Sequence, residues 1–206
     1  MNVPAVDFIA ADRLTCSRAG RVVFGDLTLR ARSGQLVVIE GANGSGKTSL
    51  LRLLAGLLEP TEGSIVLKAE DVEHSDAEER RRFVGWLGHQ DAVKPQMTPA
   101  ETVRFFARLH GSTGNSSDPL KLVGLTKMAD LPCQYLSAGQ KKRLALARLQ
   151  VLARPLWLLD EPLAALDSEG KVLFTSLVTA HLASGGIAIM ATHEPIEVPS
   201  DRLRLS

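Results

Sequence analysis

The feature that most constrains this chain is a glycine-rich loop that directly follows a wholly apolar stretch. The run Leu36-Val37-Val38-Ile39 is typical of a strand buried on both faces of a parallel sheet. The loop Gly41-Ala42-Asn43-Gly44-Ser45-Gly46-Lys47-Thr48 comes next, and a helix with leucines along one face is expected from about Lys47 to Leu58. Strand, loop and helix in this order match the phosphate-binding loop in full.

The residue types of this loop suit a nucleotide phosphate. Glycines let successive backbone N–H groups curve around an anion without a Cβ in the way, and the helix N-terminus adds a partial positive charge at the same point. Lys47 is expected to reach the β- and γ-phosphates, and the Thr48 hydroxyl is expected to bind Mg²⁺. The loop by itself leaves open whether the nucleotide is ATP or GTP.

Two acids follow a second apolar run, Leu156-Trp157-Leu158-Leu159. In an α/β sheet, ligands bind outside the carboxyl ends of the strands, so Asp160 and Glu161 should emerge beside the phosphate loop. We expect Asp160 to hold Mg²⁺ through water and Glu161 to act as the general base on the attacking water. The alternative, an N-cap for the next helix, does not explain why the acids follow an unbroken apolar strand and precede Pro162.

The rest of the chain predicts an α/β fold in one domain, residues 1–206. Further strands are expected at Val6–Cys16, Leu27–Ala31, Ser64–Leu67 and Ile187–Ala191, and helices at Pro99–His110, Gln140–Leu152 and Ser168–Ala183, with a loop over 111–117. The mostly helical part interrupts the alternation of strands and helices. We therefore predict a helical subdomain over about 98–154, inserted into a catalytic core of 1–97 and 155–206.

Composition excludes several classes of protein. The net charge of +1 argues against a nucleic-acid partner, because proteins that bind nucleic acid usually carry a strongly basic surface. No stretch approaches the ~20 apolar residues needed to cross a bilayer, and the N-terminus lacks the pattern of a signal peptide. Cys16 and Cys133 are far apart, which favours two reduced thiols in a cytosolic protein.

The segment Leu136-Ser137-Ala138-Gly139-Gln140 predicts a second anion site at the start of a helix. A chain with one phosphate loop does not need a second phosphate site of its own. The site makes sense if Ser137 and Gly139 serve the nucleotide of a second copy in a two-fold dimer.

This segment resembles the signature motif of ABC-type ATPases, usually Leu-Ser-Gly-Gly-Gln, with Ala138 in place of the middle glycine. The resemblance implies ATP as the nucleotide, with Gln140 in the nucleotide site. It also implies an ABC-type nucleotide-binding domain of the P-loop NTPase fold, with an N-terminal antiparallel β subdomain and an inserted helical subdomain.

Three further positions match the family's order of motifs. Gln90 fits the glutamine loop that senses Mg²⁺ and the γ-phosphate and faces the membrane subunit. Ala165-Leu166-Asp167 fits the loop that crosses the dimer seam, and His193 fits the switch histidine at the γ-phosphate. The family usually has an aromatic residue that stacks on adenine, whereas this chain has Arg18 near that place; a stacked guanidinium and a solvated charge both remain open.

Within the family, this chain is most similar to the ATP-binding subunit of bacterial cytochrome c maturation systems. The similarity lies in the short length, in Tyr135 and Trp157, and in the amino-acid sequence of the phosphate loop. That resemblance implies a peripheral location at the cytoplasmic face of the inner membrane, beneath membrane subunits, and a role in haem export or in release of a haem chaperone. The five histidines are scattered, so this chain is not expected to ligate haem itself.

Three alternatives remain: another short exporter for lipid, polysaccharide or drug; a soluble ABC ATPase that acts on ribosomes or DNA; and a nucleotide kinase. The gap from Lys47 to Ser137 is too short for the long coiled coil usual in the soluble class. The signature segment, Leu136 to Gln140, argues against a nucleotide kinase.

Overall fold

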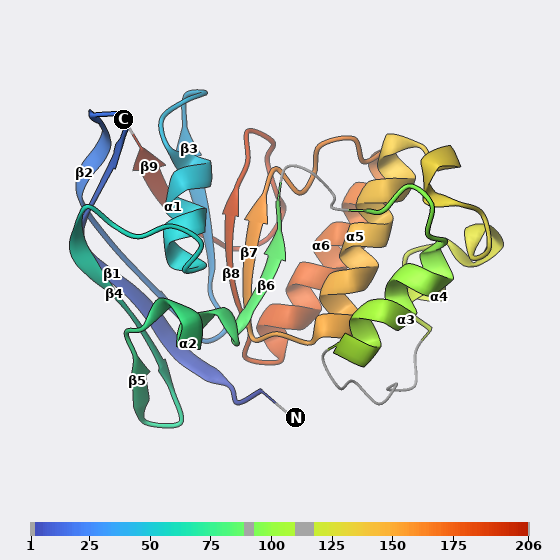
Figure 1. Ribbon diagram of the computed structural model, residues 1–206, viewed down its shortest axis with the longest axis horizontal. Coiled ribbons are helices and arrows are strands. Elements are labelled where there is room, and N and C mark those ends of the chain that lie inside the picture. Colours follow the sequence, from blue (N-terminus) through green and yellow to red (C-terminus); the bar gives the residue numbers. More distant parts are fainter. Residues whose placement is uncertain (1–2, 89–92, 110–117, 206) are drawn as a thin grey trace.

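The computed structural model describes residues 3–88, 93–109 and 118–205. Within these ranges no helix has the length and apolar character needed to span a membrane. The chain forms two sheets with one helix between them and a group of helices on the far side of the larger sheet (Figure 1).

The larger sheet is parallel, with the order β6-β7-β8-β3-β9. Its strands are β6 (Val84–Leu87), β7 (Leu156–Asp160), β8 (Ile187–Ala191), β3 (Leu36–Gly41) and β9 (Asp201–Leu205). Alternate residues of the central strands enter two different hydrophobic clusters: Leu156 and Leu158 join one, Trp157 and Leu159 the other. Both faces of these strands are buried, which explains why their sequences are unbroken apolar runs.

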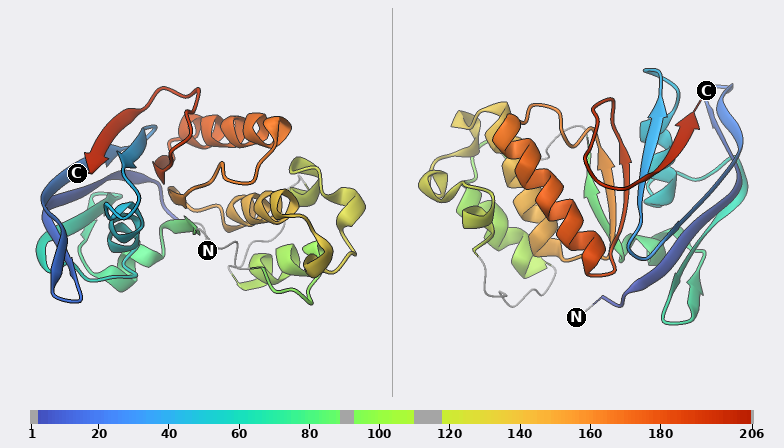
Figure 2. Two further views of the ribbon diagram at one scale, coloured as in Figure 1. Left: turned by 90° about the horizontal axis from the view of Figure 1, so that it is seen from above. Right: turned by 180° about the vertical axis from the view of Figure 1, so that it is seen from behind.

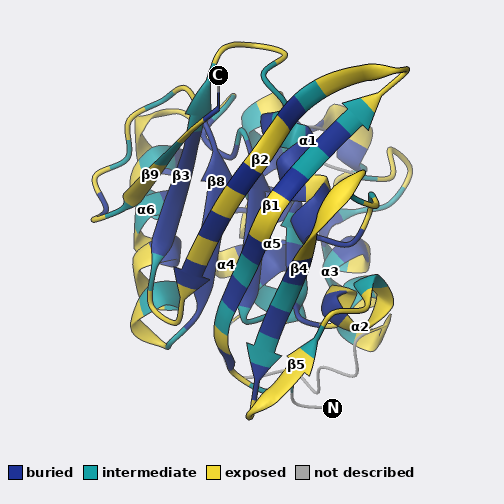
Figure 3. Ribbon diagram, turned by 90° about the vertical axis from the view of Figure 1, so that its left-hand side faces the viewer, coloured by how far each residue is buried: buried dark blue, intermediate teal, exposed yellow. Residues whose placement is uncertain are grey.

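The smaller sheet is antiparallel, with the order β2-β1-β4-β5. It consists of β1 (Val6–Arg18), β2 (Arg21–Arg32), β4 (Glu62–Ala69) and β5 (Val72–His74). Buried and exposed residues alternate along these strands (Figure 3), so only one face of the sheet belongs to the core. This sheet confirms the expected antiparallel β subdomain.

Helix α1 (Lys47–Leu54) lies between the two sheets (Figures 1 and 2). Its four leucines are 0% exposed, which places both the helix and the loop that precedes it in a rigid setting. The short helix α2 (Ala77–Arg81) follows β5 at the rim of the smaller sheet.

The opposite face of the parallel sheet is covered by α5 (Ala138–Leu152) and α6 (Ser168–Ala183), as Figures 1 and 2 show. Helix α3 (Pro99–Leu109) and the short α4 (Pro119–Leu122) pack on α5 from outside. Two 3₁₀ turns, η1 (Thr126–Met128) and η2 (Cys133–Tyr135), complete this helical group.

Several predicted elements match closely. Helix α6 and strand β8 have the predicted bounds, and α3 begins at Pro99 as expected. The capping box before α3 is present, since Thr98 and Glu101 each accept a hydrogen bond from the other's backbone N–H, at 3.2 and 2.9 Å.

Helix α1 is shorter than predicted and ends at Leu54 instead of Leu58. Gly56 takes a left-handed conformation with φ of 69°, and a Cβ there would lie 2.6 Å from the carbonyl oxygen of Ala77. The chain therefore turns away because another backbone approaches closely, a tertiary cause that local sequence does not reveal.

Strands β6 and β9 at the two edges of the parallel sheet were not predicted. Only two of the five residues of β9 are apolar, and β6 spans four residues, so neither shows the continuous run of the central strands. His110, which ends the predicted helix, and the predicted loop 111–117 lie outside the described residues.

Candidate nucleotide site at the carboxyl edge of the parallel sheet

The phosphate loop connects the end of β3 to the start of α1 and lies close to neighbouring backbone. A Cβ on Gly41 would lie 2.6 Å from the carbonyl oxygen of Leu205 in β9. Gly46 has φ of 99°, and a Cβ there would lie 2.7 Å from Val23 Cγ1. Ala42, Asn43 and Gly44 are exposed, so the concave backbone between these two glycines faces outward and can receive an anion.

Lys47 folds back over this loop. Its ammonium donates hydrogen bonds to the carbonyl oxygens of Gly41 at 2.8 Å and Ala42 at 3.0 Å, and it lies 3.1 Å from His193 Nε2. An ammonium only donates, so Nε2 is the acceptor in this contact. The lysine is 8% exposed and already lies at the loop that it is predicted to serve.

Thr48 and Asp160 meet as predicted for a metal site. The Thr48 hydroxyl donates to Asp160 Oδ2 at 2.9 Å, although the two residues are 112 positions apart. Asp160 is 3% exposed and ends β7. A hydroxyl and a carboxylate are the hard oxygen donors that Mg²⁺ prefers.

These two residues do not form a complete metal cage by themselves. Among the described residues there is no group of three or more His, Cys, Asp or Glu that could hold a metal ion. Mg²⁺ is usually bound by one or two protein oxygens together with waters and substrate phosphates, so the donor set fits a metal that arrives with a nucleotide.

Glu161 adopts a conformation that is rare for a residue with a side chain. Its φ is 47°, and its backbone N–H donates to the carbonyl oxygen of Ala191 at 2.9 Å. Its carboxylate Oε1 lies 3.7 Å from His193 Nε2. Backbone strain of this kind often marks a functional position, and here the acid lies near His193, the predicted switch histidine.

The signature segment starts α5 through a capping box. Ser137 accepts a hydrogen bond from the Gln140 N–H at 3.2 Å, and Gln140 Oε1 accepts one from the Ser137 N–H at 2.9 Å. Ser137 is exposed, whereas Gly139 packs so closely that a Cβ there would lie 2.8 Å from the carbonyl oxygen of Ala165. The signature loop thus contacts the loop expected at the dimer seam within the same chain.

Asp167 ends that seam loop and caps α6. Its carboxylate accepts hydrogen bonds from the Gly170 N–H and from Arg143, both at 2.8 Å. The Arg143 guanidinium and the Gly170 N–H hold the pKa of Asp167 below its usual value, so this carboxylate stays charged.

The predicted site residues form two groups. Lys47, Thr48, Asp160, Glu161 and His193 meet at the carboxyl ends of β3, β7 and β8. Figures 1 and 2 place the start of α5, which carries Ser137 and Gly139, on another part of the molecule, beyond β7 and α6. Arg18 lies exposed at the end of β1, and Gln90 is outside the described residues.

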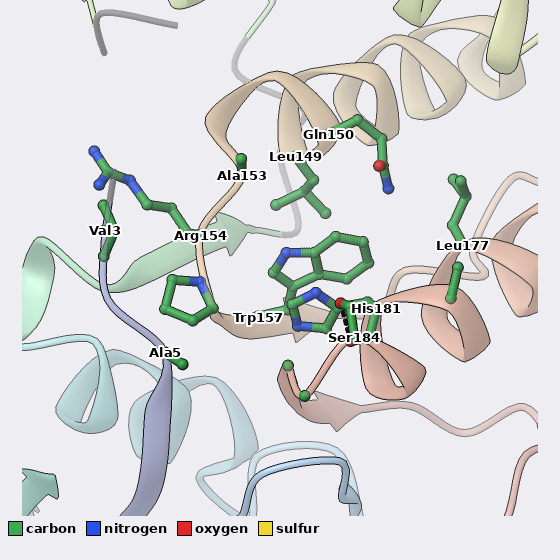
Figure 4. A pocket seen from close by; sticks show the side chains of 14 residues that line it. Val3, Ala5, Leu149, Gln150, Ala153, Arg154, Trp157, Leu177, His181 and Ser184 are labelled. Atoms are coloured by element: carbon green, nitrogen blue, oxygen red, sulfur yellow. Dashed lines mark hydrogen bonds between the residues drawn. The ribbon is translucent and has the colours of Figure 1, made fainter. Parts of the chain in front are cut away.

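A larger cavity of about 500 Å³ lies at the opposite, amino-terminal edge of the sheet (Figure 4). Trp157 and His181 stack in it with ring centroids 3.9 Å apart and an angle of 8° between their planes. None of the residues lining it belongs to the predicted nucleotide site. A smaller cavity of about 280 Å³ lies beside that site and is lined by Gly41 and His193 among others. Position relative to strand direction, rather than size, identifies the functional edge.

Parallel strands between helical layers, with a phosphate loop and a strand-end carboxylate pair, define the class of P-loop nucleotide-hydrolysing proteins. A protein-family model described as ABC transporter matches residues 24–164. The chain belongs to the ABC transporter family, as an ATP-binding subunit of ATPase type.

Curated relatives match along nearly the whole chain. The cytochrome c biogenesis ATP-binding export protein of Nitrobacter winogradskyi is 48% identical, with 96% of this chain and 97% of the relative covered. The protein of the same name from Rhodopseudomonas palustris is 49% identical and covers 93% of this chain and 94% of its own length.

Solved structures share the fold. An ATP-binding protein of an ABC transporter from Pyrococcus furiosus superposes with a TM-score of 0.82 at 22% identity, covering 96% of this chain and 97% of its own. A dimeric ATP-binding cassette in a post-hydrolysis state with ADP and Pi superposes with a TM-score of 0.76 at 26% identity, covering 90% and 88%.

The structure also shows residues near the site that sequence reasoning missed. Val23 packs against Gly46, and β9 pairs with β3 next to the start of the phosphate loop. Arg143, Lys171 and Glu194 form ion pairs around the seam and switch loops. In the sequence Arg143 stood out only as part of the run that follows the signature segment. The two ion pairs join residues 24 and 23 positions apart, so local sequence does not reveal them.

Proposed function

We propose that this chain hydrolyses Mg·ATP as one of two identical subunits beneath a membrane transporter of c-type cytochrome biogenesis. The observation that carries the proposal is the convergence of Lys47, Thr48, Asp160, Glu161 and His193 at one edge of the sheet. The names of the curated relatives support the biogenesis role. The peripheral location at the cytoplasmic face of the inner membrane belongs to the same proposal.

In this mechanism Lys47 exchanges its present partners for the β- and γ-phosphates. Those partners are two loop carbonyls and His193 Nε2, all of which the ammonium can leave for a more negative group. When Lys47 leaves, His193 Nε2 is released, and it contacts a γ-phosphate oxygen as a donor, which requires the ring proton on Nε2. Gln90 is proposed to sense the same phosphate and the metal.

Asp160 and Thr48 would hold Mg²⁺, and the metal would neutralise charge that develops on the phosphates. Glu161 then accepts a proton from the attacking water as general base. Its fixed backbone, with the N–H bonded to Ala191, keeps the carboxylate next to His193.

A second copy completes each site. Because the signature loop lies apart from the phosphate loop of its own chain, we infer that Ser137, Gly139 and Gln140 serve the nucleotide of the partner, with Asp167 at the seam. The dimeric cassette with ADP and Pi supports this arrangement. Closure moves the helical part, about 98–154, against the core of 1–97 and 155–206 and so transmits the motion to membrane helices.

The proposal is tested by co-purification from membranes. A tagged Glu161→Gln chain with ATP should remain a closed dimer that binds ATP without turnover and should carry its membrane partner along. The matched control, Glu161→Gln with Lys47→Ala, should not close because it lacks tight phosphate binding.

Membrane proteins of cytochrome c maturation in the ATP-dependent fraction would support the proposed role. A different permease would retain the motor and reassign the transported substrate. Ribosomes or DNA in that fraction would contradict transport, and normal hydrolysis by Glu161→Gln would contradict the assignment of the base.

A further inference from the structure

The first turn of α6 is joined to the signature helix by an ion pair. Arg143 of α5 donates to Asp167 Oδ1 at 2.8 Å and lies 3.4 Å from Glu169 Oε2. The Arg143 side chain is 13% exposed and so has a defined position. Helix α5 is the helix that Ser137 starts, so this ion pair joins the signature helix to the start of α6.

The same turn of α6 also holds the switch loop. Lys171 Nζ forms an ion pair with Glu194 Oε2, and Glu194 directly follows His193. The Glu194 N–H donates to Thr192 Oγ1 at 3.0 Å, and Thr192 is 4% exposed. The residues on both sides of the switch histidine are therefore anchored, one by burial and the other by Lys171.

We propose that Lys171 is a positioning residue: through Glu194 it holds His193 at the γ-phosphate side of the nucleotide site. The proposal rests on the function proposed above for His193. Lys171 joins the start of α6 to the switch loop of its own site, and the Arg143–Asp167 pair joins it to the signature helix. The start of α6 thus links the switch loop to the helix that is proposed to meet the partner's ATP.

The need for this anchor follows from the contacts of His193. The side chain is 48% exposed, and within the described part of the chain its polar contacts are with Lys47 and Glu161. Both of those groups change partners when phosphates and the attacking water arrive. The tie between Lys171 and Glu194 does not involve a reacting group, so it persists while the other two contacts are exchanged.

A positioning role and a structural role predict different effects on turnover and on thermal stability. The two side chains of the pair are 44% and 36% exposed, and ion pairs at that exposure contribute little to global stability. In contrast, a displacement of about 1 Å at a reacting group can lower turnover by roughly a hundred-fold. Loss of the pair should therefore lower kcat while the thermal midpoint stays near that of the wild type.

The experiment measures ATP turnover by the full chain in Lys171→Met, Glu194→Gln, the double variant and the charge exchange Lys171→Glu with Glu194→Lys. Each single variant should lose roughly ten-fold in kcat with KM for ATP within about two-fold of wild type. The double variant should be no slower than the singles, and the charge exchange should recover most of the loss.

Two further variants serve as references. Lys68→Met breaks an ion pair with Asp71 at 2.9 Å on the smaller sheet and should leave turnover unchanged. His193→Ala sets the full loss expected when the switch histidine is missing.

Wild-type kcat in Lys171→Met, or losses that multiply in the double variant, would overturn the positioning role while leaving the proposed function intact. Wild-type turnover in His193→Ala would overturn both, because there would be no switch histidine to position.

Discussion

The two edges of the parallel sheet place a histidine in opposite settings. At the carboxyl edge His193 is half-exposed, accepts a hydrogen bond from Lys47 and lies beside Glu161. At the amino edge His181 stacks on Trp157, lies 3.1 Å from the carbonyl oxygen of Ile187 and is partly buried (Figure 4). Nε2 of His193 faces an ammonium, which only donates, whereas Nε2 of His181 faces a carbonyl oxygen, which only accepts.

This difference teaches that the direction of the strands, rather than residue type or cavity size, assigns function here. The same strands β7 and β8 run through both edges. At their carboxyl ends the chain leaves the sheet in loops with exposed polar groups, and a helix N-terminus points into the space. At their amino ends two helices finish, and the stacked rings of Trp157 and His181 line the cavity there. His193 is therefore free to exchange partners, whereas His181 holds strands together.

The largest expected effect is at the carboxyl edge. Lys47→Ala should weaken Mg·ATP binding by roughly a hundred-fold or more, because the ammonium makes charge-assisted bonds to phosphate that no neighbour replaces. Equilibrium titration with a fluorescent ATP analogue measures the change, and Lys68→Ala on the smaller sheet is the control. Unchanged affinity in Lys47→Ala would mean that the phosphates bind elsewhere.

A change at the amino edge should affect stability without affecting binding. A Cβ on Gly186 would lie 2.3 Å from the His181 ring, so Gly186→Ala should destabilise the fold by roughly 1–3 kcal/mol while KM for ATP stays at the wild-type value. Chemical unfolding and steady-state kinetics measure the two quantities.

Gly25→Ala is the matched control for Gly186→Ala, because the nearest atom to a Cβ there is 3.6 Å away. A raised KM in Gly186→Ala would show that the two edges are coupled, contrary to the comparison.

A smaller effect concerns pH. Desolvation by burial lowers the pKa of His181 to about 4, from an ordinary value of 6.5. The unfolded chain takes up a proton below pH 6.5, whereas the folded chain does so only near pH 4. The contribution to stability is thus present above pH 6.5 and is lost as the pH falls toward 4.

Between pH 7 and pH 5 the free energy of unfolding should fall by roughly 2 kcal/mol from this residue. His181→Phe keeps an aromatic ring on Trp157 and removes the titration. Urea unfolding at both pH values should show a shallower dependence in the variant. An equal dependence in both proteins would mean that His181 titrates normally in the folded chain.

Sequence patterns alone determined much of the chemistry of this protein. The phosphate loop, the Asp160–Glu161 pair and the signature segment are contiguous motifs, so their residue types and spacing are visible without a fold. The central strands were predictable for a related reason: burial on both faces requires an unbroken apolar run, and only β6 and β9 at the edges escaped that rule.

Only the tertiary structure decided how these motifs meet. It brings Thr48 to Asp160 and Lys47 to His193 across 112 and 146 positions of sequence, ends α1 early at a close backbone approach, and pairs Lys171 with Glu194. In the folded chain His181 packs on Trp157 and His193 is exposed, although the two histidines are 12 positions apart in sequence. The physical reason is that local sequence specifies strands and loops, whereas the order and direction of strands in the sheet determine which loop ends share an edge.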